Sequence, residues 1–184
     1  MNPGKRLTLK LILIGDGGVG KTSIIQQYVH AAFAHDYKIT IGLDVTAKTV
    51  YLEDGTSAQL SIHDIGGQER FASVRNLFYK GAHLSMAVYD ITREQTLKNL
   101  DNVWIPELLK YGPMPGSLHQ PELKILFIGN KSDLKHLQSI RKKEGEALAE
   151  KYNAVGHIWT SAKNNINVEE SFINLVKAFT EDNF

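Results

Sequence analysis

The sequence Gly-Asp-Gly-Gly-Val-Gly-Lys-Thr fills residues 15–22, between an apolar run at residues 7–14 and a helical pattern from Lys21 to about residue 32. It fits G-x-x-x-x-G-K-[ST], whose glycines let consecutive backbone N–H groups face phosphate oxygens at a helix N-terminus. The lysine of this pattern reaches the β- and γ-phosphates, and the next hydroxyl coordinates Mg²⁺. A glycine-rich turn with a surface lysine is the plainer alternative. The predicted phosphate-binding residues are Gly15, Gly17, Gly18, Val19, Gly20, Lys21, Thr22 and Ser23.

Strand and helix patterns alternate along the rest of the chain. Strands are predicted at residues 42–52, 57–65, 84–90, 123–128 and about 155–160, and helices at about 94–111, 140–152 and 168–179. Glu53-Asp54-Gly55 predicts a hairpin between the first two of these strands. Residues 75–80 should be irregular and residues 112–121, rich in proline, should form an exposed loop. Pro106 should kink its helix or mark the helix's true start.

This alternation predicts an α/β fold with a mostly parallel sheet covered on both faces and one antiparallel strand from the hairpin. The length of 184 residues suits one domain over residues 1–184, with no repeat and no linker. Ligands of such folds bind at the carboxyl ends of the strands. Each motif described here begins where a predicted strand ends, so we expect one shared site.

A second motif, Asp64-Ile65-Gly66-Gly67-Gln68, follows the second hairpin strand. A carboxylate at this place holds the metal, usually through a water, a glycine N–H approaches the γ-phosphate, and a glutamine orients the attacking water. Alone, an aspartate before glycines is more often simply a turn. Downstream of the phosphate loop, it predicts Asp64 as a metal ligand beside Thr22, and Gln68, Gly67 and Lys21 as catalytic.

A third motif, Asn130-Lys131-Ser132-Asp133, follows the apolar strand at residues 123–128. Guanine displays an N1–H and an amino group side by side, and an ionised carboxylate accepts from both. Adenine offers no such donor pair, so Asp133 should select guanine. The stem of Lys131 should lie along the base, and Asn130 should tie this loop to the phosphate loop. A merely polar loop would be favoured if the tetrapeptide stood alone.

The fourth motif, Thr160-Ser161-Ala162-Lys163, closes the last strand. The Ala162 N–H should donate to the guanine carbonyl, with Ser161 and Lys163 supporting the loop. Alone it carries almost no information. The order of the four motifs, each at a strand end, predicts a site for GTP or GDP with Mg²⁺.

These residues resemble the Ras superfamily of small GTPases over nearly the whole chain, and most of all its Rab branch. Residues 37–44, Tyr-Lys-Ile-Thr-Ile-Gly-Leu-Asp, are similar to the Rab switch I, and residues 69–71, 78–82 and 88–92 to further Rab signatures. The resemblance implies the P-loop NTPase fold, three α/β/α layers around a six-stranded sheet. It also implies that Thr40 coordinates Mg²⁺ in the triphosphate state, that Phe33 packs edge-on against guanine, and that Tyr37 helps to bind the nucleotide.

The chain also departs from the Rab pattern. Rabs usually carry Phe, Trp and Tyr as a surface triad that effectors recognise, whereas Val45, His63 and Phe78 stand here, so effector identity does not transfer. Ile65-Gly66 replaces Thr-Ala, and the two adjacent glycines should loosen switch II when no γ-phosphate is present. The sequences of residues 42–44 (Gly-Leu-Asp) and 64–68 (Asp-Ile-Gly-Gly-Gln) are similar to those of a divergent Rab subgroup associated with cilia and endosomal retrieval.

The resemblance implies a slow GTPase that works with effector, exchange-factor and GTPase-activating proteins. Arg70 and Arg75 are expected to be surface residues, so an arginine supplied in trans should accelerate hydrolysis roughly 10³- to 10⁵-fold. One rival is a nucleotide-dependent binding module with negligible hydrolysis, against which Gln68 argues. The other is an ATP-using P-loop enzyme such as a kinase, against which Asp133 argues.

Composition narrows the possible partners and locations. A net charge of +1 is too small to produce an electrostatic field that would attract nucleic acid. The absence of cysteine excludes disulfides, zinc–thiolate sites and a prenylated end in the chain as written. The basic residues 141–143 lie beside Glu144 and Glu146 and should form a solvated helix face. We expect a cytoplasmic monomer, peripheral to an endomembrane or ciliary membrane only if a lipidated tail belongs to the full-length product.

Overall fold

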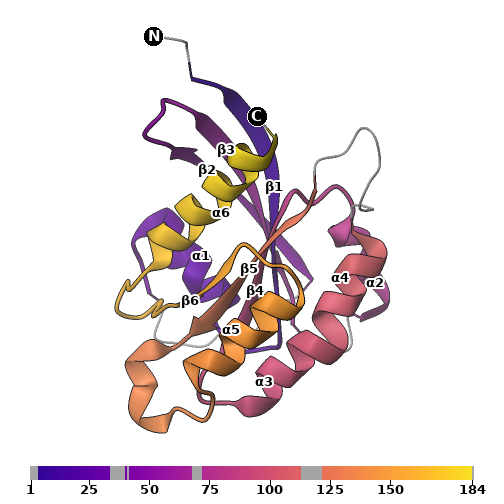
Figure 1. Cartoon of the computed structure of the whole chain (residues 1–184), viewed down its shortest axis with the longest axis vertical. Coiled ribbons are helices and arrows are strands. Elements are labelled where there is room, and N and C mark those ends of the chain that lie inside the picture. The colour runs from indigo at the N-terminus through magenta and orange to yellow at the C-terminus, as the bar shows by residue number, and fades with distance from the viewer. Residues whose placement is uncertain (1–3, 34–39, 41, 68–71, 113–121, 184) are drawn as a thin grey trace.

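Six strands form one mixed sheet in the computed structural model, which describes residues 4–33, 40, 42–67, 72–112 and 122–183 (Figure 1). Their order is β2-β3-β1-β4-β5-β6, and every neighbouring pair is parallel except β2 with β3. The strands are β1 (Arg6–Ile14), β2 (Leu43–Tyr51), β3 (Ser57–Ile65), β4 (Leu84–Asp90), β5 (Lys124–Asn130) and β6 (Gly156–Trp159). The predicted α/β fold is confirmed.

Helices cover both faces of the sheet and complete three layers (Figure 1). One face packs against α1 (Lys21–His30) and α6 (Val168–Asn183). The other packs against α2 (Ala72–Tyr79), the continuous run α3 (Glu94–Asn99), η2 (Leu100–Trp104) and α4 (Ile105–Tyr111), and α5 (Lys142–Lys151). Side chains alternate between the two faces of a strand, so Leu11 and Leu13 of β1 join the first core while Ile12 and Ile14 join the second.

The predicted hairpin joins β2 to β3. Gly55 has a φ of +84°, in the left-handed region that favours glycine, and the Asp54 carboxylate accepts from the Thr56 N–H at 2.8 Å and from its hydroxyl at 3.0 Å. This turn fixes the antiparallel register, in which Val45 lies directly opposite His63. Two members of the altered Rab triad are therefore cross-strand neighbours.

The expectation of an irregular segment at residues 75–80 is wrong, because α2 spans Ala72–Tyr79. Its 8 residues are too few for a 3.6-residue period to stand out in the sequence. The helix is held by groups far along the chain: Arg75 donates two hydrogen bonds of 2.7 Å to Glu107, and the Tyr79 hydroxyl donates to the same carboxylate at 3.2 Å.

The helix that contains Pro106 changes its hydrogen-bond register instead of breaking. Pro106 lies in the first turn of α4, directly after the π-helical turn η2, where the Ile105 N–H bonds to the Leu100 carbonyl. Because proline has no N–H, the next carbonyl in that pattern, Asp101, needs a donor from elsewhere. The Tyr152 hydroxyl, which lies directly after α5, donates to it at 3.1 Å.

The carboxyl ends of the parallel strands lie at one edge of the sheet, where Leu13 pairs with Asp64 and Asp90 with Asn130. The short helix η3 (Ser132–Leu137) follows β5 and includes the end of the third motif, where the sequence analysis predicts no helix. Residues 113–121 of the predicted proline-rich loop lie outside the described residues.

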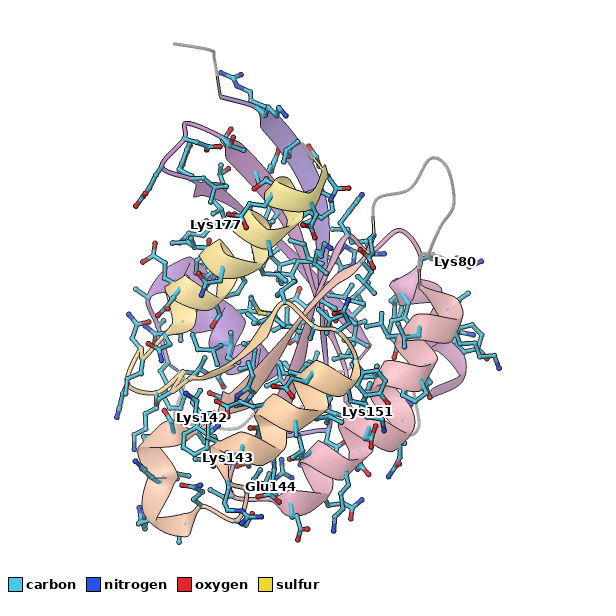
Figure 2. All side chains as sticks on the ribbon, in the orientation of Figure 1. Lys80, Lys142, Lys143, Glu144, Lys151 and Lys177 are labelled. Atoms are coloured by element: carbon cyan, nitrogen blue, oxygen red, sulfur yellow. The ribbon has the colours of Figure 1, made fainter. Side chains whose placement is uncertain are left out.

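Two surface features accompany this architecture. Lys142 and Lys143 are exposed at the start of α5, as expected for a solvated helix face (Figure 2). Within the described ranges, no helix is both long enough and apolar enough to cross a membrane.

Candidate nucleotide-binding site

The phosphate loop of residues 15–22 follows β1 and leads into α1. Gly15, Gly18 and Gly20 have φ values of +134°, +75° and +101°, so the backbone curls in a way that residues with a Cβ rarely adopt. Space is short as well: a Cβ on Gly15 would lie 2.1 Å from the Val88 carbonyl oxygen. Among described side chains none caps the start of α1, which leaves its N–H groups and dipole for an anionic ligand.

Lys21 is buried, with 5% of its surface exposed, and its Nζ donates to the carbonyls of Gly15 at 2.6 Å and Asp16 at 3.0 Å. Burial lowers its pKa to about 8, although the carboxylates of Asp64 and Asp16 oppose that change. A desolvated ammonium gains more than an exposed one from an anionic partner. The placement therefore suits the predicted contact with nucleotide phosphates.

Three oxygens meet beside this lysine, each from a different segment of the chain. Thr22 Oγ1 lies 2.8 Å from Thr40 Oγ1 and donates to Asp64 Oδ2 at 2.5 Å, and Thr40 Oγ1 lies 3.2 Å from the same carboxylate oxygen. Adjacent ligands of an octahedral Mg²⁺ lie about 2.9 Å apart, because each is 2.0–2.1 Å from the metal. All three residues predicted to hold the metal are thus brought together at a spacing that fits it.

The surroundings of Asp64 would favour a cation at this point. Burial raises the pKa of its carboxyl group, and hydrogen bonds from Thr22 and Thr40 and the charge of Lys21 only partly offset that. Its second oxygen, Oδ1, is buried and accepts no hydrogen bond from the described residues. An under-compensated buried carboxylate is a strong ligand for a hard cation.

The two glycines after β3 pack closely against both neighbouring segments. A Cβ on Gly67 would lie 2.5–2.6 Å from backbone atoms of residues 15–17, so Gly67 touches the phosphate loop. A Cβ on Gly66 would lie 2.9 Å from the Thr40 carbonyl oxygen, and the Gly66 N–H donates to the Gly42 carbonyl at 2.9 Å. Gly66 in place of the usual Rab alanine thus has a packing reason. Gln68 lies outside the described residues.

Asn130 joins the phosphate loop to both loops predicted to bind the base. Its Nδ2 donates to the Val19 carbonyl at 2.9 Å, while its Oδ1 accepts from the Thr160 hydroxyl at 3.0 Å and from the Ala162 N–H at 3.3 Å. The first bond makes the tie that the sequence predicts. The last one engages the N–H that we expect to donate to the guanine carbonyl.

Asp133 is half-buried and held in place by the neighbouring loop. The Ser161 hydroxyl donates to its Oδ1 at 2.6 Å and accepts from the Asn164 N–H at 3.1 Å. The supporting role predicted for Ser161 is thus visible. Lys163 is exposed and has no hydrogen bond or ion pair within the described part of the chain.

One chain of ion pairs at the site is not predicted by the motifs. The Lys131 Nζ lies 2.8 Å from Asp90 Oδ2, which Arg93 Nε also contacts at 3.0 Å, and Arg93 Nη2 donates to the Gly17 carbonyl at 3.1 Å. Although burial opposes it, hydrogen bonds from Lys131 and Thr92 lower the pKa of Asp90. The sequence signal for Asp90 is its position at the end of β4, because each of the other parallel strands also leads into one of the four motifs.

Of the remaining predicted residues, two are placed in or beside α1, one is buried against expectation, and the others lie outside the described residues. Phe33 is half-buried and packs against the core of α1 and α6, and Ser23 lies in the first turn of α1. Arg75 is not a surface residue: 4% of it is exposed, and Glu107 holds its guanidinium. Tyr37, Arg70 and the segment 69–71 lie outside the described residues.

Comparison with known proteins agrees with this geometry. Residues 10–181 match the model of the Ras family. The chain is 39% identical over 168 residues to the Ras-related protein Rab-8 of Diplobatis ommata, covering 91% of this chain and 75% of that protein. It is 36% identical to rat Rab-19 over 168 residues (91% and 73%) and 37% identical to Rab2BV of Beta vulgaris over 163 residues (89% and 72%). The chain therefore belongs to the Ras family, as a small GTPase of the Rab branch.

Proposed function

We propose that this chain is a guanine-nucleotide switch that hydrolyses GTP to GDP slowly unless a partner accelerates it. The observation that carries the proposal is the meeting of Thr22, Thr40 and Asp64 oxygens within 3.2 Å of one another beside the buried Lys21. Thr40 belongs to the segment similar to the Rab switch I. A metal held by all three would tie that segment to the phosphate loop.

The phosphates would be bound by the loop backbone, the α1 N-terminus and Lys21. Mg²⁺, when bound through Thr22, Thr40 and Asp64, supplies positive charge against the β- and γ-oxygens. Gly67 would offer its N–H to the γ-phosphate, and Gln68 would orient the attacking water. Gly17, which has no side chain, would leave room for Gln68 and for an arginine from a partner.

The pairing of nearby arginines supports an arginine supplied in trans. Arg75 donates to Glu107 through Nε and Nη2, and Arg93 is shared between Asp90 and the Gly17 carbonyl. Releasing Arg75 would leave Glu107 without its main partner. We therefore propose a low intrinsic rate and a rate with an activating protein about 10³- to 10⁵-fold higher.

The switch itself would be a change of order in two segments. Thr40 and Gly67 contact the metal and the γ-phosphate only in the triphosphate state, so hydrolysis would release both. Effectors would then recognise nucleotide state next to Val45, His63 and Phe78. Hydrogen exchange over residues 34–45 and 64–76 tests this: protection should be higher with a non-hydrolysable GTP analogue than with GDP, and equal protection would contradict it.

Guanine selection is tested by Asp133→Asn. The amide turns one acceptor into a donor, so GTP affinity should fall about 10- to 100-fold. Xanthine carries a carbonyl where guanine carries its amino group, so XTP should bind the variant better than it binds the unsubstituted chain. Asp182→Asn, at the end of α6, is the matched control. A variant with unchanged GTP affinity would show that Asp133 does not bind the base.

Hydrolysis is tested separately from binding. Single-turnover phosphate release from [γ-³²P]GTP should be slow but measurable, and Gln68→Ala should reduce it while leaving GDP affinity unchanged. No release above the rate in buffer would favour the nucleotide-dependent binding module. Preference for ATP over GTP in competition would favour an ATP-using enzyme.

The proposed setting is vesicle or membrane trafficking, on the basis of the Rab-named relatives. A ciliary or endomembrane location rests on the amino-acid sequence of residues 42–44 and 64–68 alone. Partners would be an effector, an exchange factor and an activating protein, with the chain itself a monomer. Pull-down with the GTP-analogue and GDP forms in parallel would identify partners that distinguish the two states.

A further inference from the structure

Asp16, the second residue of the phosphate loop, points away from the phosphates and into the helical layer. Its Oδ1 accepts from Trp104 Nε1 at 2.7 Å, and its Oδ2 accepts from Asn99 Nδ2 at 2.7 Å. Both partners belong to the α3–η2 run. Two hydrogen bonds from different residues to the two oxygens of one carboxylate fix the direction of that side chain, so this contact holds the loop at one point.

Trp104 also contacts the helix that follows the second motif. The Arg75 guanidinium of α2 lies 4.2 Å from the centroid of the Trp104 ring, and Glu107 orients that guanidinium through two hydrogen bonds. Only 2% of Trp104 and 4% of Arg75 is exposed. A desolvated cation over an indole ring is a favourable contact that depends on distance and angle.

The same part of the loop receives two more contacts. Gly67 packs against the backbone of residues 15–17, and Lys21 Nζ lies 5.8 Å from the Trp104 ring centroid. A movement of α2 would therefore reach the phosphate loop through the contact of Arg75 with Trp104 and the hydrogen bond of Trp104 to Asp16.

We infer that Trp104 is a positioning residue that couples α2 to the phosphate loop, through Arg75 on one side and Asp16 on the other. Its N–H holds the loop in the shape that grips the nucleotide, and its ring senses the position of α2. The inference rests on the proposed function, because it concerns how tightly the same site holds GDP or GTP.

The first experiment measures release of a fluorescent GDP analogue. Asp16→Ala and Trp104→Phe should each speed release about tenfold, and the double variant by clearly less than the product of the two factors, because both remove the same hydrogen bond between Asp16 and Trp104. Asp16→Asn, which keeps the volume of the side chain, should act in the same direction if Trp104→Phe folds poorly. Tyr152→Phe is the matched control, since it removes bonds to the same helical run without touching the loop.

The second experiment uses Trp159→Phe, which leaves Trp104 as the only tryptophan of the chain. Its emission should differ between the GDP and GTP-analogue forms, and adding Arg75→Met should abolish the difference. The inference would be overturned if the single variants bind nucleotide and release it at the rate of the unsubstituted chain, or if their effects on the release rate multiply in the double variant. It would also be overturned if the emission difference persists after Arg75→Met. Failure of the unsubstituted chain to bind guanine nucleotide would instead contradict the proposed function.

Discussion

A methyl group on Gly67 has no room in the structure, because it would lie 2.5 Å from the Asp16 carbonyl carbon. Gly67→Ala should therefore push the Gly67 N–H away from the phosphate loop. We expect affinity for a GTP analogue to fall about tenfold or more, from loss of a hydrogen bond to a charged oxygen, while GDP affinity changes little. Titration with both nucleotides measures this.

Gly81→Ala is the control for Gly67→Ala. Gly81 has a φ of +70°, and a methyl group there would meet no described atom within 4 Å, so the change adds backbone strain alone. It should lower stability without altering either affinity. Equal losses for GDP and the GTP analogue in Gly67→Ala would contradict a specific contact with the γ-phosphate.

His157 makes the free energy of unfolding depend on pH. It is hydrogen-bonded to the Tyr89 hydroxyl at 2.8 Å, and burial lowers its pKa to about 4 from the ordinary 6.5. Between pH 6.5 and 4 this histidine is protonated in the unfolded chain but not in the folded chain. Its contribution to the free energy of unfolding is therefore complete above pH 6.5 and is lost as the pH falls toward 4. After allowance for partial exposure, the loss is about 2 kcal/mol.

Urea unfolding at pH 7.5 and pH 5.0 tests the role of His157. His157→Gln should lose less stability between the two pH values than the unsubstituted chain, because glutamine does not titrate. His136→Gln, at an exposed position of η3, is the control and should leave the pH dependence unchanged. The same dependence in His157→Gln would assign it to other groups.

At the scale of elements, the run α3–η2–α4 depends on Tyr152. The single proton of its hydroxyl is shared between the Asp101 carbonyl at 3.1 Å and the Asp101 carboxylate at 2.6 Å. Tyr152→Phe should lower the free energy of unfolding by about 1–2 kcal/mol. Pro106→Ala restores a backbone N–H near the Asp101 carbonyl. In that background, Tyr152→Phe should therefore lower the free energy of unfolding by less than it does in the unsubstituted chain.

A double-mutant cycle by thermal or urea unfolding measures that difference. Coupling of about 0.5–1 kcal/mol between Tyr152→Phe and Pro106→Ala would support the shared acceptor. Tyr111→Phe is the control, because the Tyr111 hydroxyl has no hydrogen bond within the described residues. Strict additivity would show that Tyr152 does not replace the donor that proline lacks.

Elements differ in how well the sequence predicts them, and α2 and β5 show why. β5 consists of buried residues throughout, so its apolar run is visible without any knowledge of its neighbours. α2 is short and is held by Arg75 and Tyr79 on Glu107. An arginine is usually exposed, so nothing local predicts that this one is buried.

At the scale of the whole molecule, ligand binding should raise thermal stability. A nucleotide with Mg²⁺ at 1,000 times its Kd adds about 4 kcal/mol to the free energy of unfolding. For a chain of 184 residues that shifts Tm by about 8–16 °C. EDTA should remove much of the shift, because the oxygens of Thr22, Thr40 and Asp64 lose their cation.

Thermal unfolding with GDP–Mg²⁺, GDP–EDTA and ADP–Mg²⁺ measures this linkage. ADP should give no shift at the same concentration, since it lacks the donors that Asp133 would accept. A shift with ADP equal to that with GDP would contradict guanine selection. An unchanged GDP shift in EDTA would contradict the metal site.

The convergence of the site could be predicted because strand ends share one edge of a parallel sheet, and each motif sits at such an end. The tie between Asn130 and the phosphate loop followed from that arrangement and is present. The bond between Asp16 and Trp104 could not be predicted, since it joins residues 88 positions apart through a side chain whose direction depends on helix packing. Local patterns specify which groups are available, and packing specifies which of them meet.

Asn130 has a consequence for how a bound molecule would leave. One amide holds the Val19 carbonyl while accepting from Thr160 and Ala162. Because one side chain joins the phosphate loop to residues 160–162, we expect displacement of either segment to weaken the hydrogen bonds that hold the other. We therefore expect a partner protein that displaces the phosphate loop to loosen the base-binding loop at residues 160–163 as well, so that phosphate and base contacts are lost together.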